Sequence, residues 1–179
     1  MKLISTKFNG LKVVQSKNFN DSRGFFKENF KQSYFKKISF VFGCISSSKK
    51  NVLRGMHMQT KFSQGKYVSV IKGSILDVVV DLRKNSKTFG KHFKIVLSDK
   101  NAKSVYVPPG FAHGFLGLKK ENIISYFCTN YRSKKHEVGL QWNDKDLKIK
   151  WPIKKPIISN KDKNNLRLKD FIKLYKWKK

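Results

Sequence analysis

Short apolar runs separated by turn residues fill the middle of the chain. Each run holds four to eight residues and is rich in β-branched and aromatic side chains. Turn residues such as Lys72-Gly73-Ser74 and Pro108-Pro109-Gly110 stand between them. Short strands at this spacing indicate a sandwich or barrel. The predicted strands are Lys66–Ile71, Ile75–Leu82, His92–Leu97, Ser104–Val107 and Asn122–Cys128.

Helical patterns are confined to two places. Phe30–Ile38 favours a short helix, and Asn164–Trp177 favours a basic C-terminal helix within 164–179. No long helices alternate with the strands, as a parallel sheet would require. No repeat, linker or change of composition divides the sequence. We therefore predict one domain, 1–179, that is mainly β, most simply a jelly roll with short flanking helices.

Length and composition narrow the class of protein. A chain of 179 residues with 39% hydrophobic content can bury one core. It lacks the roughly 18 consecutive apolar residues of a membrane helix, and its polar start, MKLISTKFNG, does not resemble a signal peptide. Cys44 and Cys128 could pair, but two cysteines make no disulfide framework. We expect two reduced, buried thiols in a cytoplasmic protein.

The formal net charge of +29 raises the question of nucleic-acid binding, because phosphate backbones attract lysine and arginine. The charge is spread along the chain and thickens only at its end. Forked guanidiniums suit bases and phosphates better than lysine does, yet nearly all the positive charge is lysine. We interpret it as a solvated surface with no specific nucleic-acid partner. The arginines are Arg23, Arg54, Arg83, Arg132 and Arg167.

Two histidines and one aspartate are candidates for chemistry. The spacing Pro108-x-Gly110-x-x-His113 resembles the second motif of the cupin superfamily, a jelly-roll barrel that often holds a metal. The first cupin motif contains His-x-His, but here the stretch is His57-Met58-Gln59. Because a divalent ion usually needs at least three protein ligands, we predict this fold without a metal or other cofactor.

Asp77 stands inside the apolar run Ile75–Leu82, where a carboxylate is costly to bury unless it is paired. A place at a barrel mouth facing water is the alternative interpretation.

Seven blocks, taken in order, resemble the dTDP-4-dehydrorhamnose 3,5-epimerase family. The resemblance covers about residues 5–165. A single block would be weak evidence, whereas seven in the family's order are specific. The blocks are DSRGFFKE (Asp21 to Glu28), VLRGMHMQ (Val52 to Gln59), the segment from Ser63 to Gly90, VPPGFAHGF, the tyrosine of ISYFCTNY, WNDKDLKIKWP (Trp142 to Pro152) and ISNKD (Ile158 to Asp162).

The resemblance implies a catalytic role for four residues. His57 would remove a proton next to the 4-keto group of a dTDP-6-deoxyhexulose, with Asp162 orienting its ring. Lys66 would stabilise the enolate oxygen, and Tyr126 would return a proton from the opposite face. Alone, Tyr126 also reads as a core tyrosine, Lys66 as a surface lysine and Asp162 as a helix cap.

The same resemblance implies a substrate-binding set. Arg23 and Arg54 would hold the diphosphate, Phe26 and Glu28 would contact the base, and Asp77 with His113 would line the sugar pocket as a second buried pair. The complete predicted set is Arg23, Phe26, Glu28, Ser46, Arg54, Gln59, Asp77, His113 and Arg132.

Several positions that would contact the nucleotide depart from the family pattern. Phe42 and Cys44 occupy positions that are usually polar, whereas Ser46 and Ser48 keep the expected type. Arg132 stands where an aromatic residue commonly sandwiches the base, and an arginine face can stack as well. The reaction is therefore better defined by the sequence than the substrate is.

We thus expect a cofactor-free isomerase that epimerises C3 and C5 of dTDP-4-dehydro-6-deoxyglucose for rhamnose and cell-surface polysaccharide synthesis. The resemblance also implies a homodimer in which Phe26 and Glu28 act across the subunit boundary. An epimerase of C3 alone, an epimerase of another nucleotide-linked keto sugar, and a non-catalytic basic cupin-like module are the alternatives. A sugar 3,4-ketoisomerase fits this base and tyrosine less well.

Overall fold

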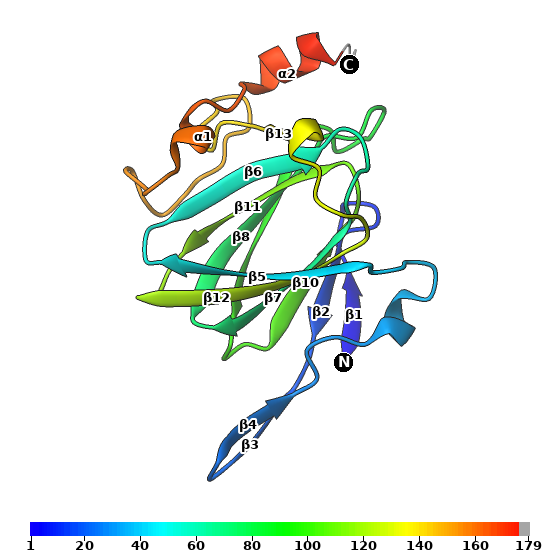
Figure 1. Cartoon of the computed structure of the whole chain (residues 1–179), viewed down its shortest axis with the longest axis vertical. Coiled ribbons are helices and arrows are strands. Elements are labelled where there is room, and N and C mark those ends of the chain that lie inside the picture. Colours follow the sequence, from blue (N-terminus) through cyan, green and yellow to red (C-terminus); the bar gives the residue numbers. More distant parts are fainter. Residues whose placement is uncertain (176–179) are drawn as a thin grey trace.

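Eight consecutive strands form a barrel with two antiparallel walls in the computed structural model, which describes residues 1–175 (Figure 1). Every connection between them crosses from one wall to the other, except the β8–β9 hairpin. This is jelly-roll topology and confirms the mainly β prediction. One wall contains, in order, β5 (Phe42–Lys49), β12 (Glu121–Cys128), β7 (Lys66–Lys72) and β10 (Lys103–Val107), extended by β2 (Lys12–Gln15) and β1 (Lys2–Ser5); the other contains β13 (Glu137–Gly139), β6 (Leu53–Gln59), β11 (Phe111–Gly117), β8 (Ser74–Asp81) and β9 (His92–Ser98).

All five predicted strands are present within one residue of their expected ends. The sequence pattern missed β5, β6 and β11, which carry glycines and polar residues in place of β-branched runs. In β6 and β11 the glycines serve packing, because a Cβ on Gly55 would lie 2.6 Å from Cα of Gly114. The two backbones therefore approach closely beside His57 and His113.

Three clusters of buried apolar side chains stabilise the fold. Val68, Val79 and Phe115 belong to the cluster between the two walls. A second cluster joins the outer face of the β6 wall to the C-terminal segment through Met56 and Phe171. The third covers the outside of the other wall. Burying such side chains contributes about 25 cal/mol per Å² of apolar surface.

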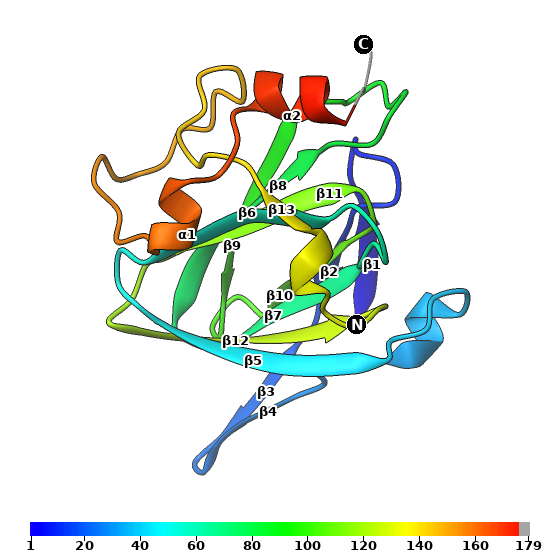
Figure 2. The ribbon, with the colours of Figure 1, turned by 45° about the horizontal axis from the view of Figure 1, so that its top comes forward.

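The C-terminal segment lies over the β6 wall (Figure 2) and contains α1 (Asn160–Lys163) and α2 (Leu168–Leu174). The prediction that a helix begins at Asn164 is wrong. Asn165 donates to the Gly55 carbonyl, and Leu166 pairs with Leu140 as a β-bridge, so this stretch is held extended. The rest of the predicted helix, residues 176–179, lies outside the described residues.

The N-terminal third contains a hairpin of β3 (Asn18–Asp21) and β4 (Gly24–Lys27) that projects away from the barrel (Figure 1). The helix predicted over Phe30–Ile38 is only one 3₁₀ turn, η1 (Gln32–Phe35). Phe30 instead stacks on Phe127, with ring centroids 4.7 Å apart, and so lies outside the turn.

Two further expectations concern the cysteines and membranes. Cys128 is buried as predicted, but Cys44 is exposed because it lies on β5, an edge strand of its wall. Both thiols are free. Within residues 1–175, no helix is long and apolar enough to cross a membrane.

Candidate active site

His57 and Asp162 form a hydrogen-bonded dyad. His57 lies on β6, and Asp162 lies on α1, where Nε2 and Oδ1 are 2.6 Å apart. Burial alone would raise the pKa of Asp162, but its bonds to His57 and to the Gly55 amide outweigh burial and lower it. A carboxylate can only accept, so Nε2 carries the hydrogen and Nδ1 is left as the basic nitrogen. Ser159 caps α1 by accepting from the Asp162 amide, so the Asp162 carboxylate does not serve as the cap.

A second dyad lies deeper in the barrel. His113 of β11 and Asp77 of β8 are joined by a 2.7 Å bond between Nε2 and Oδ2. Their side chains are only 6% and 1% exposed, so the alternative of a barrel mouth facing water is wrong for Asp77. A buried carboxylate paired in this way is stable because its desolvation is offset.

Tyr126 projects from the opposite wall. It lies on β12, its hydroxyl is 3.1 Å from the Ser46 hydroxyl, and its ring meets the His113 ring edge-on at 6.4 Å. Burial raises the pKa of Tyr126 well above its ordinary value. The phenol therefore stays protonated at neutral pH and is available as a proton donor.

Lys66 begins β7 on the same wall and is paired in register with Cys128. Burial lowers the pKa of its amine, while the field of Glu137 works in the opposite direction. Lys66 is half-buried, so it is not a fully exposed surface lysine, and its amine lies near Cys44 and Arg132.

Arg54 and Gln59 lie at opposite ends of β6. Arg54 is exposed, and its guanidinium donates to the Ser48 hydroxyl at 2.9 Å and to the Ser47 carbonyl at 3.0 Å. The remaining donors of the fork can meet an anion. Gln59 is buried, and its amide bonds the backbone of Phe62, Tyr131 and Ser133. The Gln59 amide therefore links β6 to the loops that contain Phe62, Tyr131 and Ser133.

Arg132 contacts a carboxylate that the sequence analysis missed. Its Nε is 3.0 Å from Oε2 of Glu137, which also bonds Lys161. Glu137 is the single acid between Glu121 and Asp144 in a lysine-rich stretch, and that isolation is the only sequence signal that marks it.

The remaining predicted residues lie apart from this group. Arg23, Phe26 and Glu28 belong to the projecting hairpin or follow it directly. Arg23 pairs with Asp21 on the surface, and Phe26 is 66% exposed. Within one chain, the hairpin is therefore not part of the barrel interior (Figure 1).

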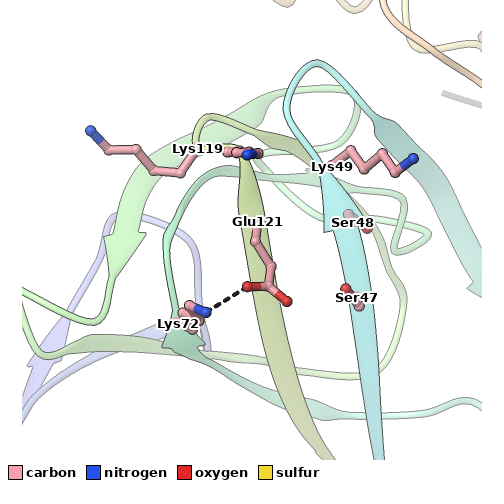
Figure 3. Close-up of a pocket in the computed structure, with 7 residues that line it drawn as sticks. Ser47, Ser48, Lys49, Lys72, Lys119 and Glu121 are labelled. Atoms are coloured by element: carbon pink, nitrogen blue, oxygen red, sulfur yellow. Dashed lines mark ion pairs between the residues drawn. The ribbon is translucent and has the colours of Figure 1, made fainter.

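A separate hollow of about 670 Å³ lies at one end of β5, β7 and β12 (Figure 3). Lysines surround it, and Glu121 pairs with Lys72 at 2.6 Å. His57 and Tyr126 do not line it. Among the described residues, no group of three histidine, cysteine or acidic side chains is placed to hold a metal ion.

The interior arrangement suits proton transfer at carbon. His57 projects from one wall, a protonated tyrosine projects from the other, and Lys66, opposite Cys128, is diagonally across the strand pair from Tyr126. Removing a proton next to a ketone needs such a base, a cation for the enolate and an acid.

Comparison with known proteins gives one family. The family model described as dTDP-4-dehydrorhamnose 3,5-epimerase matches residues 5–170. The chain is 41% identical to the dTDP-4-dehydrorhamnose 3,5-epimerase of Shigella flexneri, over 95% of this chain and 97% of that protein.

Solved structures agree with that match. The 3,5-epimerase of Legionella pneumophila in complex with dTDP-4-keto-L-rhamnose superposes with a TM-score of 0.89 at 37% identity, covering 94% of this chain and 93% of its own. A 3′-monoepimerase of Streptomyces bikiniensis in complex with dTDP-quinovose has the same TM-score of 0.89 but 27% identity, with 95% and 89% covered. The equal TM-scores do not distinguish a 3,5-epimerase from a 3′-monoepimerase. The higher sequence identity favours the 3,5-epimerase.

Proposed function

The chain belongs to the dTDP-4-dehydrorhamnose 3,5-epimerase family, and on that premise we propose that it epimerises C3 and C5 of dTDP-4-dehydro-6-deoxyglucose. The product would be dTDP-4-dehydrorhamnose, an intermediate for rhamnose-containing surface polysaccharide made in the cytoplasm. The observation that carries the proposal is the placement of His57 and Tyr126 on opposite walls of one barrel. Inversion at a carbon requires a proton to leave one face and another to arrive at the opposite face.

His57 Nδ1 removes the proton from the carbon beside the ketone. The electron pair of the broken C–H bond moves into an enolate, and His57 becomes an imidazolium. Asp162 holds the ring through Nε2 and stabilises this positive charge.

Lys66 stabilises the negative charge that develops on the enolate oxygen. A preorganised cation in a dehydrated site contributes several kcal/mol, about a 100-fold effect or more. Tyr126 then donates its proton to the opposite face of the carbon, and the phenolate is reprotonated through Ser46 or solvent. The His57 imidazolium then releases its proton to solvent, and the sequence repeats at the second carbon without any change in oxidation state.

The His113–Asp77 dyad lines the sugar pocket between the base and the acid. Arg54 holds the diphosphate with the donors that the serines of β5 leave free. Ser46 and Gln59 contribute to the walls of the substrate pocket. Arg132 offers a planar face on which the nucleotide base can stack.

A homodimer completes the site in this proposal. Phe19, Phe25 and Phe26 are each more than half exposed on the hairpin, and exposed aromatic residues of this kind favour a protein interface. Seated on a second copy, the hairpin brings Arg23, Phe26 and Glu28 to the partner's nucleotide. Light scattering should give twice the chain mass; a monomer with full activity would refute this assembly.

Heavy water tests the reaction. With dTDP-4-dehydro-6-deoxyglucose as substrate and a reductase to trap the product, we expect deuterium at both C3 and C5. Deuterium at C3 alone would assign a monoepimerase. No deuterium at either carbon would refute proton abstraction altogether.

A further inference from the structure

Two free thiols lie close together on the wall that carries Tyr126. Cys44 lies on β5 and Cys128 on β12. We infer that the two sulfurs form a binding site for one soft monovalent metal ion, Cu⁺, and that occupancy of this site inhibits catalysis. Binding of the ion is independent of the proposed function, and only the loss of catalysis rests on it.

The strand register places both thiols on the face from which Tyr126 projects. β5 and β12 pair so that Cys44 is directly opposite Tyr126, and Cys128 is two residues further along β12. Residues two apart on a strand share a face, and so do residues directly opposite each other in an antiparallel pair. Cys44 and Cys128 are therefore diagonal neighbours on one face, and a hydrogen bond joins their thiols.

The pair of thiols is open to solvent on one side. Cys44 is exposed, whereas Cys128 is buried, with 3% of its surface exposed. An ion can therefore reach the first sulfur from solvent and then bind the second. No step of the proposed mechanism uses either thiol.

A metal ion fits this spacing better than a disulfide does. Diagonal neighbours on antiparallel strands are about 7–8 Å apart at Cα, whereas the Cα atoms of a disulfide are usually about 4.4–6.8 Å apart. An ion between the sulfurs lengthens the link, because a metal–thiolate bond is about 2.3 Å long, as in zinc sites. Two diagonal thiols can thus share an ion without a shift of either strand.

The two sulfur donors determine which ion is bound. Soft thiolates select Cu⁺ over hard cations such as Mg²⁺. A structural zinc ion takes four ligands, and within residues 1–175 no group of three histidine, cysteine or acidic side chains could hold a metal. Cu⁺ has a filled d shell and is satisfied by two sulfurs in a line. The pair therefore suits Cu⁺ better than zinc.

Positive side chains stabilise the bound state. One Cu⁺ and two neutral thiols give an anionic complex and two protons, which pass to solvent. Burial raises the pKa of both thiols, while the fields of Lys66 and Arg132 favour the Cys44 thiolate. Lys66 is also directly opposite Cys128 in the register of β7 and β12. These two cations offset the negative charge of the complex.

Occupancy inhibits catalysis because the complex lies beside two of the proposed catalytic side chains. Cys44 is opposite Tyr126, and Cys128 is opposite Lys66. The anionic complex pairs with the Lys66 amine, which is then not available to the enolate oxygen. Its negative charge also opposes the charge that develops on the substrate.

Anaerobic titration with Cu⁺ tests the site directly. A chromophoric Cu⁺ chelator competes for the ion, so that its colour reports the affinity, and we expect one ion per chain with release of two protons at pH 7. Cys44→Ser should weaken binding at least about 100-fold, because loss of a ligand costs more than the 10- to 100-fold typical of an outer-shell partner. Cys44 is exposed, so this substitution is safe for folding even where Cys128→Ser is not. Unchanged affinity in Cys44→Ser would overturn the inference.

His92→Gln is the matched control. It removes an imidazole able to bind copper from β9, at the edge of the opposite wall. Its affinity for Cu⁺ should equal that of the wild type. A loss as large as that of Cys44→Ser would show that the ion does not sit between the thiols, and would overturn the inference.

Deuterium incorporation with and without one equivalent of Cu⁺ tests the inhibition. Each protein is compared with its own metal-free rate. The wild type should slow at least about 10-fold when Cu⁺ is present, and Cys44→Ser should slow far less. A wild type that binds Cu⁺ and keeps its rate refutes the inhibition. A metal-free wild type that incorporates no deuterium refutes the epimerase proposal, whereas the titration decides the copper site in either case.

Discussion

Single side chains acquire their roles from the partner that each one bonds. Asp162 fixes which nitrogen of His57 is basic, and Ser46 orients the Tyr126 hydroxyl. The partners are far apart in sequence, 105 residues for the first pair and 80 for the second. Chemistry at this scale is thus a property of the folded barrel.

Removing the base tests the first of these pairs. His57→Ala should lower turnover by about 100- to 10,000-fold, the usual contribution of a general base, while Asp162→Asn should cost less because the imidazole remains. Deuterium incorporation measures both, and circular dichroism checks the fold. Turnover near the wild-type level in His57→Ala would contradict the mechanism.

The pH dependence of stability reports on Glu137. Burial would raise its pKa, but the bonds from Arg132 and Lys161 and the field of His57 lower it to about 2, from an ordinary value of 4.5. A lowered carboxyl pKa stabilises the fold above pH 4.5 and loses that contribution as pH falls toward 2. The free energy of unfolding of the wild type should exceed that of Glu137→Gln by roughly 2–3 kcal/mol at pH 7. Urea titrations should show the gap narrowing below pH 4.5; a constant gap would contradict the ion-paired carboxylate.

Sequence resemblance could single out His57, Asp162, Lys66 and Tyr126 as candidates, because each stands in a block with a fixed order. Local pattern could not, since a lysine or tyrosine in an apolar strand has many possible roles. Glu137 escaped both approaches. Its ion pairs with Arg132 and Lys161 depend on the register of β13 against β6 and on the fold of α1, neither of which leaves a local pattern.

At the scale of elements, the contact between β6 and β11 sets the position of both histidines. The register pairs His113 directly with His57, and Gly55 and Gly114 let the backbones meet. Strands rich in valine and isoleucine were predictable, whereas β6 and β11 were not. Their glycines look like turn residues until the neighbouring backbone is in place.

Gly55→Ala tests this contact. Gly55 has φ of +112°, and an added Cβ would lie 2.6 Å from Gly114 Cα and 2.7 Å from the His113 carbonyl. We expect a loss of about 2–4 kcal/mol in the free energy of unfolding, together with lower activity. Thermal and urea unfolding measure the first. Gly43→Ala is the matched control, because a Cβ there meets nothing closer than 3.8 Å.

At the scale of the whole molecule, the dominant property is a net charge of +29. The fold buries its apolar residues in three clusters and leaves lysines on the surface, including those around the hollow in Figure 3. Composition predicted that distribution, but it could not predict which carboxylates would be paired.

Salt separates surface attraction from catalysis. Binding of the protein to DNA should weaken at least 10-fold between 50 and 200 mM salt, because each neutralised phosphate releases counterions. Epimerase turnover should change far less, since His57 and Tyr126, the proposed base and acid, lie inside the barrel. Filter binding and deuterium incorporation, measured in the same buffers, give the two curves. DNA binding that resists salt would favour a specific nucleic-acid module.

The two-walled barrel also governs the fate of individual hydrogen atoms. In the proposed mechanism, the atom taken by His57 leaves on the side of the β6 wall, while the atom delivered by Tyr126 comes from the β12 wall, where Ser46 contacts the Tyr126 hydroxyl. A hydrogen that leaves the sugar can return only to the face it left, which regenerates substrate. Each inverted carbon therefore carries an atom from the surrounding water, and an isotope placed there beforehand is erased from the product.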